Sequence, residues 1–300
     1  MHHLGAVPVL GVSLAHVALL RLDQAGGPAP GNKSFKLHYF LAEAQRLAVA
    51  HVVSFGGAWS NHLHALAALG HERGIATVGI IRGEQQTATL ADAQRWGMHI
   101  VRVSRQEYRQ RNDASYLQQL GERFAPCLYI PEGGATAMGA RGCTDIAELI
   151  LSQAPGFRHI VLPVGTGTTL AGLVAGLDHS YDVVGVSALR NAMDLEQRVG
   201  ELSHELLRGP LRMRKPNSHA RWRILHEHHG GGFARADTAL REFMLAFESI
   251  HGVQLDPVYT GKMMFAVHQL QARGEWSAAN PILAIHTGGL QGRRGYAWLT

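Results

Sequence analysis

The stretch "HIVLPVGTGTTLAGLVAGL" (residues 159–177) indicates the fold class of this 300-residue chain. It opens with a short apolar run rich in β-branched residues, which is typical of a buried strand, and then turns through glycines and threonines. The apolar residues that follow are typical of a buried helix. A strand that leads through a glycine-rich turn into a helix is the repeating unit of parallel α/β folds.

The same order recurs along the chain, with amphipathic stretches of helical period such as residues 34–50 and 60–74 between most of the apolar runs. The expected strands are "HVALLRL" (16–22), "HVVSFGG" (51–57), "ATVGIIRG" (76–83), "HIVRVS" (99–104), "CLYIPEGG" (127–134), "HIVLPVGTG" (159–167), "DVVGVSAL" (182–189) and "PILAIHTGG" (281–289). We therefore expect a three-layer α/β/α fold in which helices cover both faces of mostly parallel sheets. Residues 205–235 break this rhythm, and we expect an irregular connection there with one strand at "WRILHE" (222–227).

Composition restricts the class of protein. Hydrophobic residues make up 46% of the chain and charged residues 17%, which is typical of a soluble protein of one or two domains. Two cysteines are too few for a disulfide framework, so we expect a cytoplasmic location. We expect no membrane partner, because no apolar run approaches the roughly 20 residues of a membrane span, and the start lacks the features of a signal peptide.

Charge and histidine content argue against two further classes. The formal charge of +5 comes from scattered basic residues, and the one cluster, between residues 208 and 223, contains a single aromatic residue. We therefore expect a solvated arginine-rich face there and no nucleic-acid partner. The histidine-rich "HEHHG" (226–230) lacks the HExxH spacing that places two imidazoles on one face of a helix, so we expect no catalytic metal.

Lysine is rare in this chain, and two of the four lysines lie in one short motif. The chain contains 28 basic residues but only four lysines, and Lys33 and Lys36 both lie in "GNKSFKL" (31–37). An arginine stays protonated, whereas a lysine amine can lose its proton when it is desolvated and then act as a nucleophile. The motif is therefore a candidate for amine chemistry.

Two glycine-rich turns could hold a phosphate. "GGPAPGNKS" (26–34) resembles a nucleotide phosphate loop, but its lysine lies one position too late and its prolines remove backbone donors. In "GTGTT" (165–169), free amides at a helix N-terminus and adjacent hydroxyls could bind a phosphate. A tight, threonine-capped turn explains the second pattern equally well.

Three more turns carry polar side chains after expected strands. In "SFGGAWSNH" (54–62), Ser60 or Asn61 caps a helix and could face a ligand. "DPVYTGKMM" (256–264) presents Tyr259 and Thr260, and "AIHTGGLQG" (284–292) presents Thr287. Taken together, the turns offer an amine, a phosphate site, an amide, hydroxyls and a phenol. This set suits pyridoxal phosphate, which needs a lysine, a phosphate cradle and a partner for its ring nitrogen.

The ordered motifs "GNKSFKL", "GGAWSNH", "PEGGAT", "GTGTTLAG", "DPVYTGK" and "HTGG" resemble the family of 1-aminocyclopropane-1-carboxylate deaminases and D-cysteine desulfhydrases. The resemblance runs from about residue 16 to 289. It implies pyridoxal 5'-phosphate as the cofactor, the tryptophan-synthase β-type fold, a small amino-acid substrate and a homodimer. It also implies a large domain of residues 1–37 and 139–300 and a small domain of residues 38–138.

The resemblance assigns roles to individual residues. Lys33 is the Schiff-base lysine and Lys36 a second lysine against the cofactor. Asn61 hydrogen-bonds the ring oxygen, Ser60 lies over the substrate and Tyr259 lies close to the ring as a packing and proton-handling group. The phosphate is taken by a run of five residues, namely Gly165, Thr166, Gly167, Thr168 and Thr169.

The substrate follows from two threonines. Family deaminases have an acidic residue after the tyrosine of "DPVY" and a leucine before the "GG" pair, whereas the desulfhydrases have threonine at both places, as here at Thr260 and Thr287. We therefore expect a lyase that converts D-cysteine to pyruvate, sulfide and ammonia. The cyclopropane deaminase activity is the alternative. A catalytically silent pyridoxal-phosphate-binding protein is a third possibility, because Phe233 occupies a position where family members commonly have tyrosine.

Overall fold

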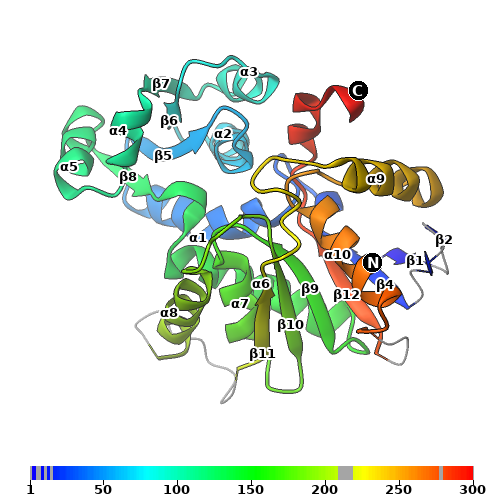
Figure 1. The fold of residues 1–300 in the computed structure, drawn as a ribbon. Helices are drawn as coiled ribbons and strands as arrows, with labels where there is room; N and C mark the ends of the chain where they lie inside the picture. Colours follow the sequence, from blue (N-terminus) through cyan, green and yellow to red (C-terminus); the bar gives the residue numbers. More distant parts are fainter. Residues whose placement is uncertain are drawn as a thin grey trace.

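The computed structural model describes residues 2–4, 8–9, 12–13, 16–208, 219–276 and 280–299 and contains two separate, mostly parallel sheets (Figure 1). The larger sheet has the order β1 (His2–Leu4), β4 (Val17–Arg21), β12 (Ile282–His286), β9 (His159–Val164), β10 (Asp182–Ser187) and β11 (Arg221–Leu225). Its strands are parallel except β1, which pairs antiparallel with β4. The smaller sheet is entirely parallel, with the order β7 (His99–Val103), β6 (Thr77–Arg82), β5 (His51–Gly57) and β8 (Cys127–Ile130). A short ribbon pairs β2 (Pro8–Val9) with β3 (Val12–Ser13).

Helices cover both faces of each sheet. The larger sheet carries α6 (Ala137–Gln153), α7 (Thr168–Gly176) and α8 (Leu195–Arg208) on one face and α9 (Thr238–His251) and α10 (Thr260–Ala272) on the other. The smaller sheet carries α1 (Asn32–Arg46), α2 (Asn61–Arg73) and α3 (Ala88–Arg95) on one face and α4 (Arg105–Arg109) and α5 (Ala114–Arg123) on the other. The described residues also form four short 3-10 helices: η1 (Leu22–Gln24), η2 (Glu132–Gly134), η3 (Leu290–Gly295) and η4 (Ala297–Leu299).

The alternation of side chains along β4 produces the layers. Ala18 and Leu20 pack with α6 and α7, whereas Val17 and Leu19 pack with α9 and α10. Successive residues of a strand point to opposite faces, so a strand between two helical layers is apolar at every position. This explains why the expected strands read as continuous apolar runs. The expected α/β/α fold with mostly parallel sheets is confirmed.

The expected strands all form, and part of the expected irregular region lies within the described residues. The strand expected at residues 222–227 forms as β11, at the edge of the larger sheet and parallel to β10. Residues 209–218, which include most of the arginine-rich stretch and Lys215, lie outside the described residues. In the part of the chain that is described, no helix combines the length and apolar character needed to cross a membrane.

The two sheets suggest the division into domains. The strands of the smaller sheet all lie between residues 51 and 130, and those of the larger sheet come from the chain on either side. We therefore propose residues 38–138 as the small domain and residues 1–37 with 139–300 as the large domain. Helix α1 connects the two, because it packs on α6 and also contributes Leu37, Phe40 and Leu41 to the core of the smaller domain.

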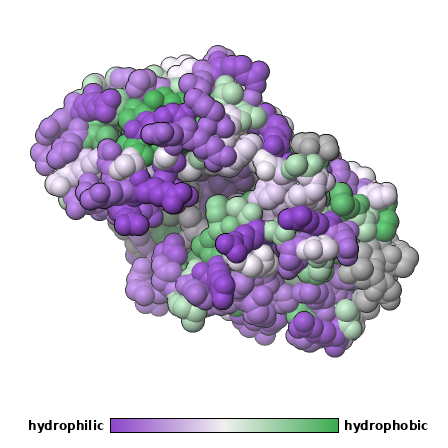
Figure 2. Space-filling view, turned by 45° about the horizontal axis from the view of Figure 1, so that its top comes forward, coloured by the Kyte–Doolittle hydropathy of each residue, from purple (hydrophilic) through white to green (hydrophobic). Residues whose placement is uncertain are grey.

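The parallel strands direct the expected functional turns to one region. The turns after β5, β9 and β12 all follow carboxyl ends of parallel strands, where ligands bind in open α/β folds. Figure 2 shows a hollow between the two lobes of the molecule. The fold therefore brings these turns to a common cleft.

The packing of α1 on α6 depends on a glycine. A Cβ at Gly142 of α6 would lie 1.9 Å from the Phe35 carbonyl oxygen of α1. We expect Gly142→Ala to lower the free energy of unfolding by about 1–3 kcal/mol, because the backbone of α1 must move. Gly121→Ala in α5 is the matched control, since a Cβ there would meet no described atom within 4 Å. The control should stabilise by up to about 1 kcal/mol. Denaturant unfolding measures both, and equal stability of the two variants would contradict the close packing.

Candidate active site

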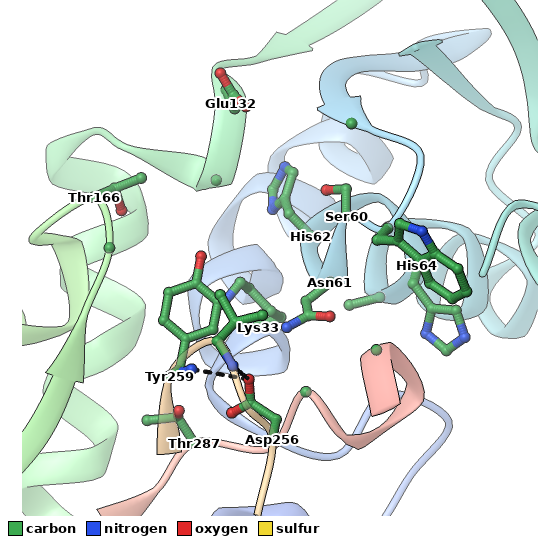
Figure 3. Close-up of a pocket in the computed structure, with 18 of the residues that line it drawn as sticks. Lys33, Ser60, Asn61, His62, His64, Glu132, Thr166, Asp256, Tyr259 and Thr287 are labelled. Carbon is green, nitrogen blue, oxygen red and sulfur yellow. Dashed lines mark hydrogen bonds between the residues drawn. The ribbon is translucent and has the colours of Figure 1, made fainter. Parts of the chain in front are cut away.

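A cleft of about 1340 Å³ lies between the two sheets and is lined from both (Figures 2 and 3). Most of the residues assigned from the sequence line it: Lys33, Lys36, Ser60, Asn61, Gly165, Thr166, Gly167, Thr169, Tyr259 and Thr287. Thr168 and Thr260 are buried behind the surface of the cleft and are not part of its lining. The structure thus brings together residues that are up to 254 positions apart in the sequence.

Lys33 lies at the start of α1, which is fixed against the end of β12. The Asn32 amide donates to the Thr287 carbonyl at 3.1 Å, and Gly31 and Gly288 form an antiparallel bridge. A Cβ at Gly31 would lie 2.5 Å from the Thr287 carbonyl oxygen, and the φ of +115° at Gly31 also requires glycine. This contact places Lys33 and Thr287 at the same end of the cleft.

The amine of Lys33 is held by a neighbouring amide and is easily deprotonated. Lys33 Nζ donates to Asn32 Oδ1 at 2.9 Å, while Asn32 Nδ2 donates to Thr169 Oγ1 at 2.9 Å. Desolvation, with a smaller contribution from the charge of Lys36, lowers the pKa of Lys33 from 10.5 to about 7. Near neutral pH a large fraction of the amine is therefore unprotonated and nucleophilic.

Lys262 does not compete for this role. It is buried in α10, and its amine donates to the Gly232 carbonyl at 2.6 Å and contacts the Ala188 carbonyl at 3.4 Å. It lies outside the lining of the cleft and ties a loop to the end of β10. Of the lysines that the structure describes, only Lys33 and Lys36 line the cleft.

The turn before α7 is a candidate anion cradle. Gly167 caps the helix with a φ of +81°, and the N–H groups of the first helical turn have no partner within the helix. Thr166 Oγ1 lies 2.8 Å from Thr168 Oγ1 and accepts a long hydrogen bond of 3.4 Å from Lys36 Nζ. Helix amides, hydroxyls and a lysine are the donors that a phosphate needs.

Ser60 and Asn61 begin α2 on the other side of the cleft. Ser60 is the helix cap and accepts a hydrogen bond from the Leu63 amide at 3.2 Å, which decides between the two expected caps. Asn61 Oδ1 accepts a hydrogen bond from Gln291 Nε2. In Figure 3 the amide nitrogen of Asn61 points toward Lys33. Asn61 therefore presents a donor to the cleft.

Asp256 organises the turn that carries Tyr259. Its Oδ2 accepts from the amides of Val258 and Tyr259 at 2.9 Å each, and its Oδ1 accepts from the amide and the hydroxyl of Thr260 at 2.8 Å each (Figure 3). The Thr260 hydroxyl thus caps the turn and lies behind the cleft. Of the two threonines matched to the desulfhydrases, Thr287 alone lines it.

Tyr259 lies against the anion cradle and keeps its proton. A Cβ at Gly165 would lie 3.1 Å from the ring, so the absence of a side chain there lets the phenol approach the turn. Burial, assisted by the charge of Asp256, raises the pKa of Tyr259. The phenol is therefore a hydrogen-bond donor at neutral pH. Phe233 lines the cleft mouth with its ring centroid 6.2 Å from that of Tyr259.

Sequence reasoning missed His62, Asn32, Asp256 and Gln291. His62 is buried beside the two lysines and its Nε2 lies 3.0 Å from Ser54 Oγ. Ser54 donates to the Ile130 carbonyl, so His62 must be the donor in that pair. Burial and the two lysine charges lower the pKa of His62 to about 3, which keeps the imidazole neutral. All four residues lie inside motifs already singled out, and the polar neighbours of the chosen residues could have been included. No local signal indicated that Gln291 would contact Asn61.

Comparisons with known proteins agree with this geometry. The model of the family described as "Pyridoxal-phosphate dependent enzyme" matches residues 7–288. The chain is 29% identical to D-cysteine desulfhydrase of Salmonella choleraesuis, covering 86% of this chain and 82% of the relative. It is 30% identical to a Thermotoga maritima protein provisionally named 1-aminocyclopropane-1-carboxylate deaminase, covering 87% of this chain and 85% of the relative. A crystal structure of an ACC deaminase homologue superposes with a TM-score of 0.81 at 25% identity, covering 93% and 86%.

The lowered pKa of Lys33 predicts unusual reactivity. In cofactor-free protein, trace acetylation of Lys33 should rise with pH to a half-maximal rate near pH 7, because only the unprotonated amine reacts. Peptide mapping of protein treated with labelled acetic anhydride measures the profile. An unstructured lysine-containing peptide, treated in the same tube, is the control. A midpoint near the ordinary value of 10.5 would show that Lys33 is not desolvated.

Proposed function

Because this chain belongs to the family of pyridoxal-phosphate-dependent enzymes, we propose that Lys33 carries the cofactor and that the enzyme eliminates sulfide from D-cysteine. The family establishes a lyase with this cofactor and a small amino-acid substrate. The particular residues and the particular reaction are the proposal. The fit of the cleft to the cofactor supports the residues, and the hydroxyl of Thr287 supports the reaction.

The donor set of the cleft fits the cofactor. The amides at the start of α7, the hydroxyls of Thr166 and Thr169, and the Lys36 amine would hold the phosphate. The helix dipole would add roughly 0.3–2 kcal/mol to the binding of this dianion. The turn at residues 26–31 is a weaker candidate, because Pro28 and Pro30 lack the amide donors.

Asn61 and Thr287 would hold the ring. Asn61 Nδ2 would donate to the ring oxygen, and the Thr287 hydroxyl would face the ring nitrogen from the end of β12. Asp256 also lines the cleft, but its carboxylate accepts four hydrogen bonds from residues 258–260. Its place in the turn supports a structural role, which leaves the neutral hydroxyl of Thr287 to face the ring nitrogen.

When bound, the cofactor supplies an electron sink for the Cα of the substrate. Lys33 would take the Cα proton, since a large fraction of its amine is unprotonated near neutral pH. Ser60 Oγ accepts a hydrogen bond from the Leu63 amide, so its hydroxyl proton would be free to donate to the substrate. Tyr259 would donate a proton or hydrogen bond from the other side of the cleft.

Thr287 is the observation that carries the choice of reaction. A carboxylate would keep the ring nitrogen protonated and deepen the electron sink, whereas a neutral hydroxyl leaves the sink shallower. Loss of the Cα proton followed by cleavage of the Cβ–S bond, with the electron pair leaving on sulfide, needs only a modest sink. Water then completes the conversion to pyruvate and ammonia. Opening of a cyclopropane ring breaks a C–C bond and needs a stronger electron sink.

Attachment of the cofactor is the first test. Borohydride reduction of the purified holoenzyme should fix the cofactor covalently to the peptide that contains Lys33. Lys33→Arg should abolish the label, because a guanidinium cannot act as the nucleophile. Lys36→Arg is the matched control and should retain it, since Lys36 Nζ contacts Thr166 in the proposed phosphate site. Label on any other peptide would refute the assignment of Lys33.

The substrate is decided by comparing kcat/KM for D-cysteine, L-cysteine and 1-aminocyclopropane-1-carboxylate, measured as pyruvate release. We expect D-cysteine to exceed the cyclopropane substrate by more than about tenfold, which corresponds to about 1.4 kcal/mol in the barrier. The 30% identity to the Thermotoga protein favours the deaminase as the second candidate. A preference for the cyclopropane substrate would establish that candidate instead, and no turnover of any substrate by holoenzyme would contradict both.

A further inference from the structure

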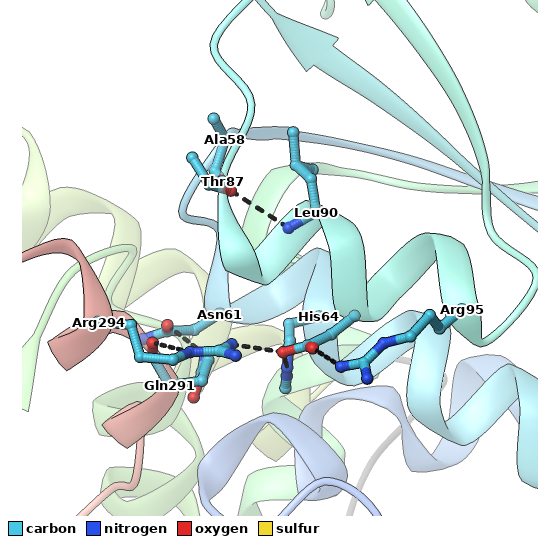
Figure 4. Close-up of polar contacts among 9 residues, drawn as sticks. Ala58, Asn61, His64, Thr87, Leu90, Arg95, Gln291 and Arg294 are labelled. Atoms are coloured by element: carbon cyan, nitrogen blue, oxygen red, sulfur yellow. Dashed lines mark hydrogen bonds and ion pairs between the residues drawn. The ribbon is translucent and has the colours of Figure 1, made fainter.

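Gln291 and Asn61 meet across the cleft, although they are 230 positions apart in the sequence. Gln291 lies in η3, directly after the turn that ends β12, and Asn61 begins α2 over the smaller sheet. Gln291 Nε2 donates to Asn61 Oδ1, and Figure 4 shows this contact beside a second pair from η3 to α3. The contact therefore joins the two sides of the site.

This hydrogen bond determines which end of the Asn61 amide faces the cleft. The side chain has one carbonyl oxygen that accepts and one amino group that donates. Gln291 engages the oxygen, and Gly292 also lies on that side, where a Cβ would be 3.7 Å from Oδ1. The nitrogen lies over Gly289, where a Cβ would be 2.6 Å from Nδ2. Asn61 thus shows its donor, and not its acceptor, to the Lys33 side of the cleft (Figure 3).

We propose that Gln291 is a positioning residue that fixes the orientation of the Asn61 amide, so that its donor meets the ring oxygen of the cofactor. The inference rests on the proposed role of Asn61 toward that oxygen. Gln291 acts through Asn61. A donor at position 291 selects the productive orientation, whereas an acceptor there would select the reverse one.

A charged network holds Gln291 in place. Arg294 Nε donates to the backbone carbonyl of Gln291 at 3.1 Å, and Arg294 Nη2 pairs with Asp92 of α3. Asp92 also pairs with Arg95 and with His64, whose Nε2 lies at 3.2 Å (Figure 4). Burial alone would raise the pKa of Asp92, but the hydrogen bonds from Arg294, Arg95 and His64 hold it at about 2. The anchor of η3 on the small domain therefore stays charged at neutral pH.

The close fit of η3 supports the same role. A Cβ at Gly295 would lie 3.1 Å from the Trp59 ring, two residues before Asn61. The segment is thus packed on both the "GGAWSNH" turn and α3, which restricts the movement of Gln291 relative to Asn61. An amide that is positioned in this way loses little rotational freedom when it engages the cofactor.

Two substitutions of Gln291 separate positioning from packing. Gln291→Leu removes the donor and leaves the Asn61 amide free to rotate. Gln291→Glu keeps the shape but offers only acceptors, so it should attract Asn61 Nδ2 and turn Oδ1 toward the ring oxygen. The measurements are the dissociation constant of pyridoxal phosphate and the pH titration of the visible absorption band of the holoenzyme. Gln118→Leu, an exposed glutamine of α5 that pairs with Glu122, is the matched control.

We expect Gln291→Leu to raise the dissociation constant by about 2–10-fold, the range of one hydrogen bond. Gln291→Glu should raise it further and shift the titration of the absorption band, while Gln118→Leu matches the wild type in both. In an Asn61→Ala background, neither Gln291 substitution should change the band further, because the amide to be positioned is gone. Melting temperatures report any loss of folding separately. The Gln291→Glu variant is nearly isosteric, so it tests the positioning role even where Gln291→Leu disturbs the packing.

Three results would overturn the inference. If Asn61→Ala shifts the band and both Gln291 variants match the wild type, Gln291 does not position the amide. If Leu and Glu have equal effects that persist in the Asn61→Ala background, Gln291 acts through packing alone. If Asn61→Ala itself leaves the band and the dissociation constant unchanged, the proposed role of Asn61 fails and the inference fails with it. This third result is distinguishable because it needs no Gln291 variant.

Discussion

The approach of Gly31 to Gly288 is the contact on which the site depends. Both glycines have positive φ, and a Cβ at Gly288 would lie 2.9 Å from the Gly31 Cα. Two backbones can come this close only where neither residue has a side chain. The contact joins the start of α1 to the end of β12, so the amine of Lys33 and the hydroxyl of Thr287 face one cavity. A single backbone contact thereby brings a lysine amine and a threonine hydroxyl together from opposite ends of the chain.

The electrostatics of the cleft follow from burying two lysines near each other. Desolvation lowers the pKa of both amines, and the same positive surroundings help to keep His62 neutral. The cleft is consequently suited to an anionic ligand, whose charge would offset that of Lys36 beside the helix amides. Asp256 also lines the cleft, but its carboxylate accepts hydrogen bonds from the Tyr259 amide and the Thr260 hydroxyl. The positive charge of Lys36 is thus available to an anionic ligand, whereas the carboxylate of Asp256 stabilises the turn in the wall of the cleft.

The two domains share the construction of the site. The proposed large domain supplies the candidate anion cradle, Tyr259 and Thr287, while the proposed small domain supplies Ser60 and Asn61. The ion pair between Arg294 and Asp92 and the hydrogen bond between Gln291 and Asn61 cross between them. The position of the smaller sheet with its helices and the orientation of the Asn61 amide are therefore linked through η3. A movement of the smaller sheet and its helices would therefore change the orientation of the Asn61 amide.

The sequence by itself determined the elements and the chemistry that local pattern encodes. Apolar runs of strand length and amphipathic runs of helical period predicted every strand of the two main sheets except β1, because burial on both faces leaves a direct mark on composition. The scarcity of lysine singled out Lys33 and Lys36, and the glycine-rich turns at strand ends located the lining of the cleft. Resemblance to a known family added the cofactor.

Only the tertiary structure decided which side chains enter the cleft and in what state. Thr260 and Thr287 look equivalent in the sequence, yet one caps a turn and the other lines the cleft. Lys262 follows a functional turn, but its amine is directed to backbone carbonyls. The contact between Gln291 and Asn61, the tautomer of His62 and the lowered pKa of Lys33 have no local signal. They depend on desolvation and on partners distant in the chain, which exist only after both sheets have packed.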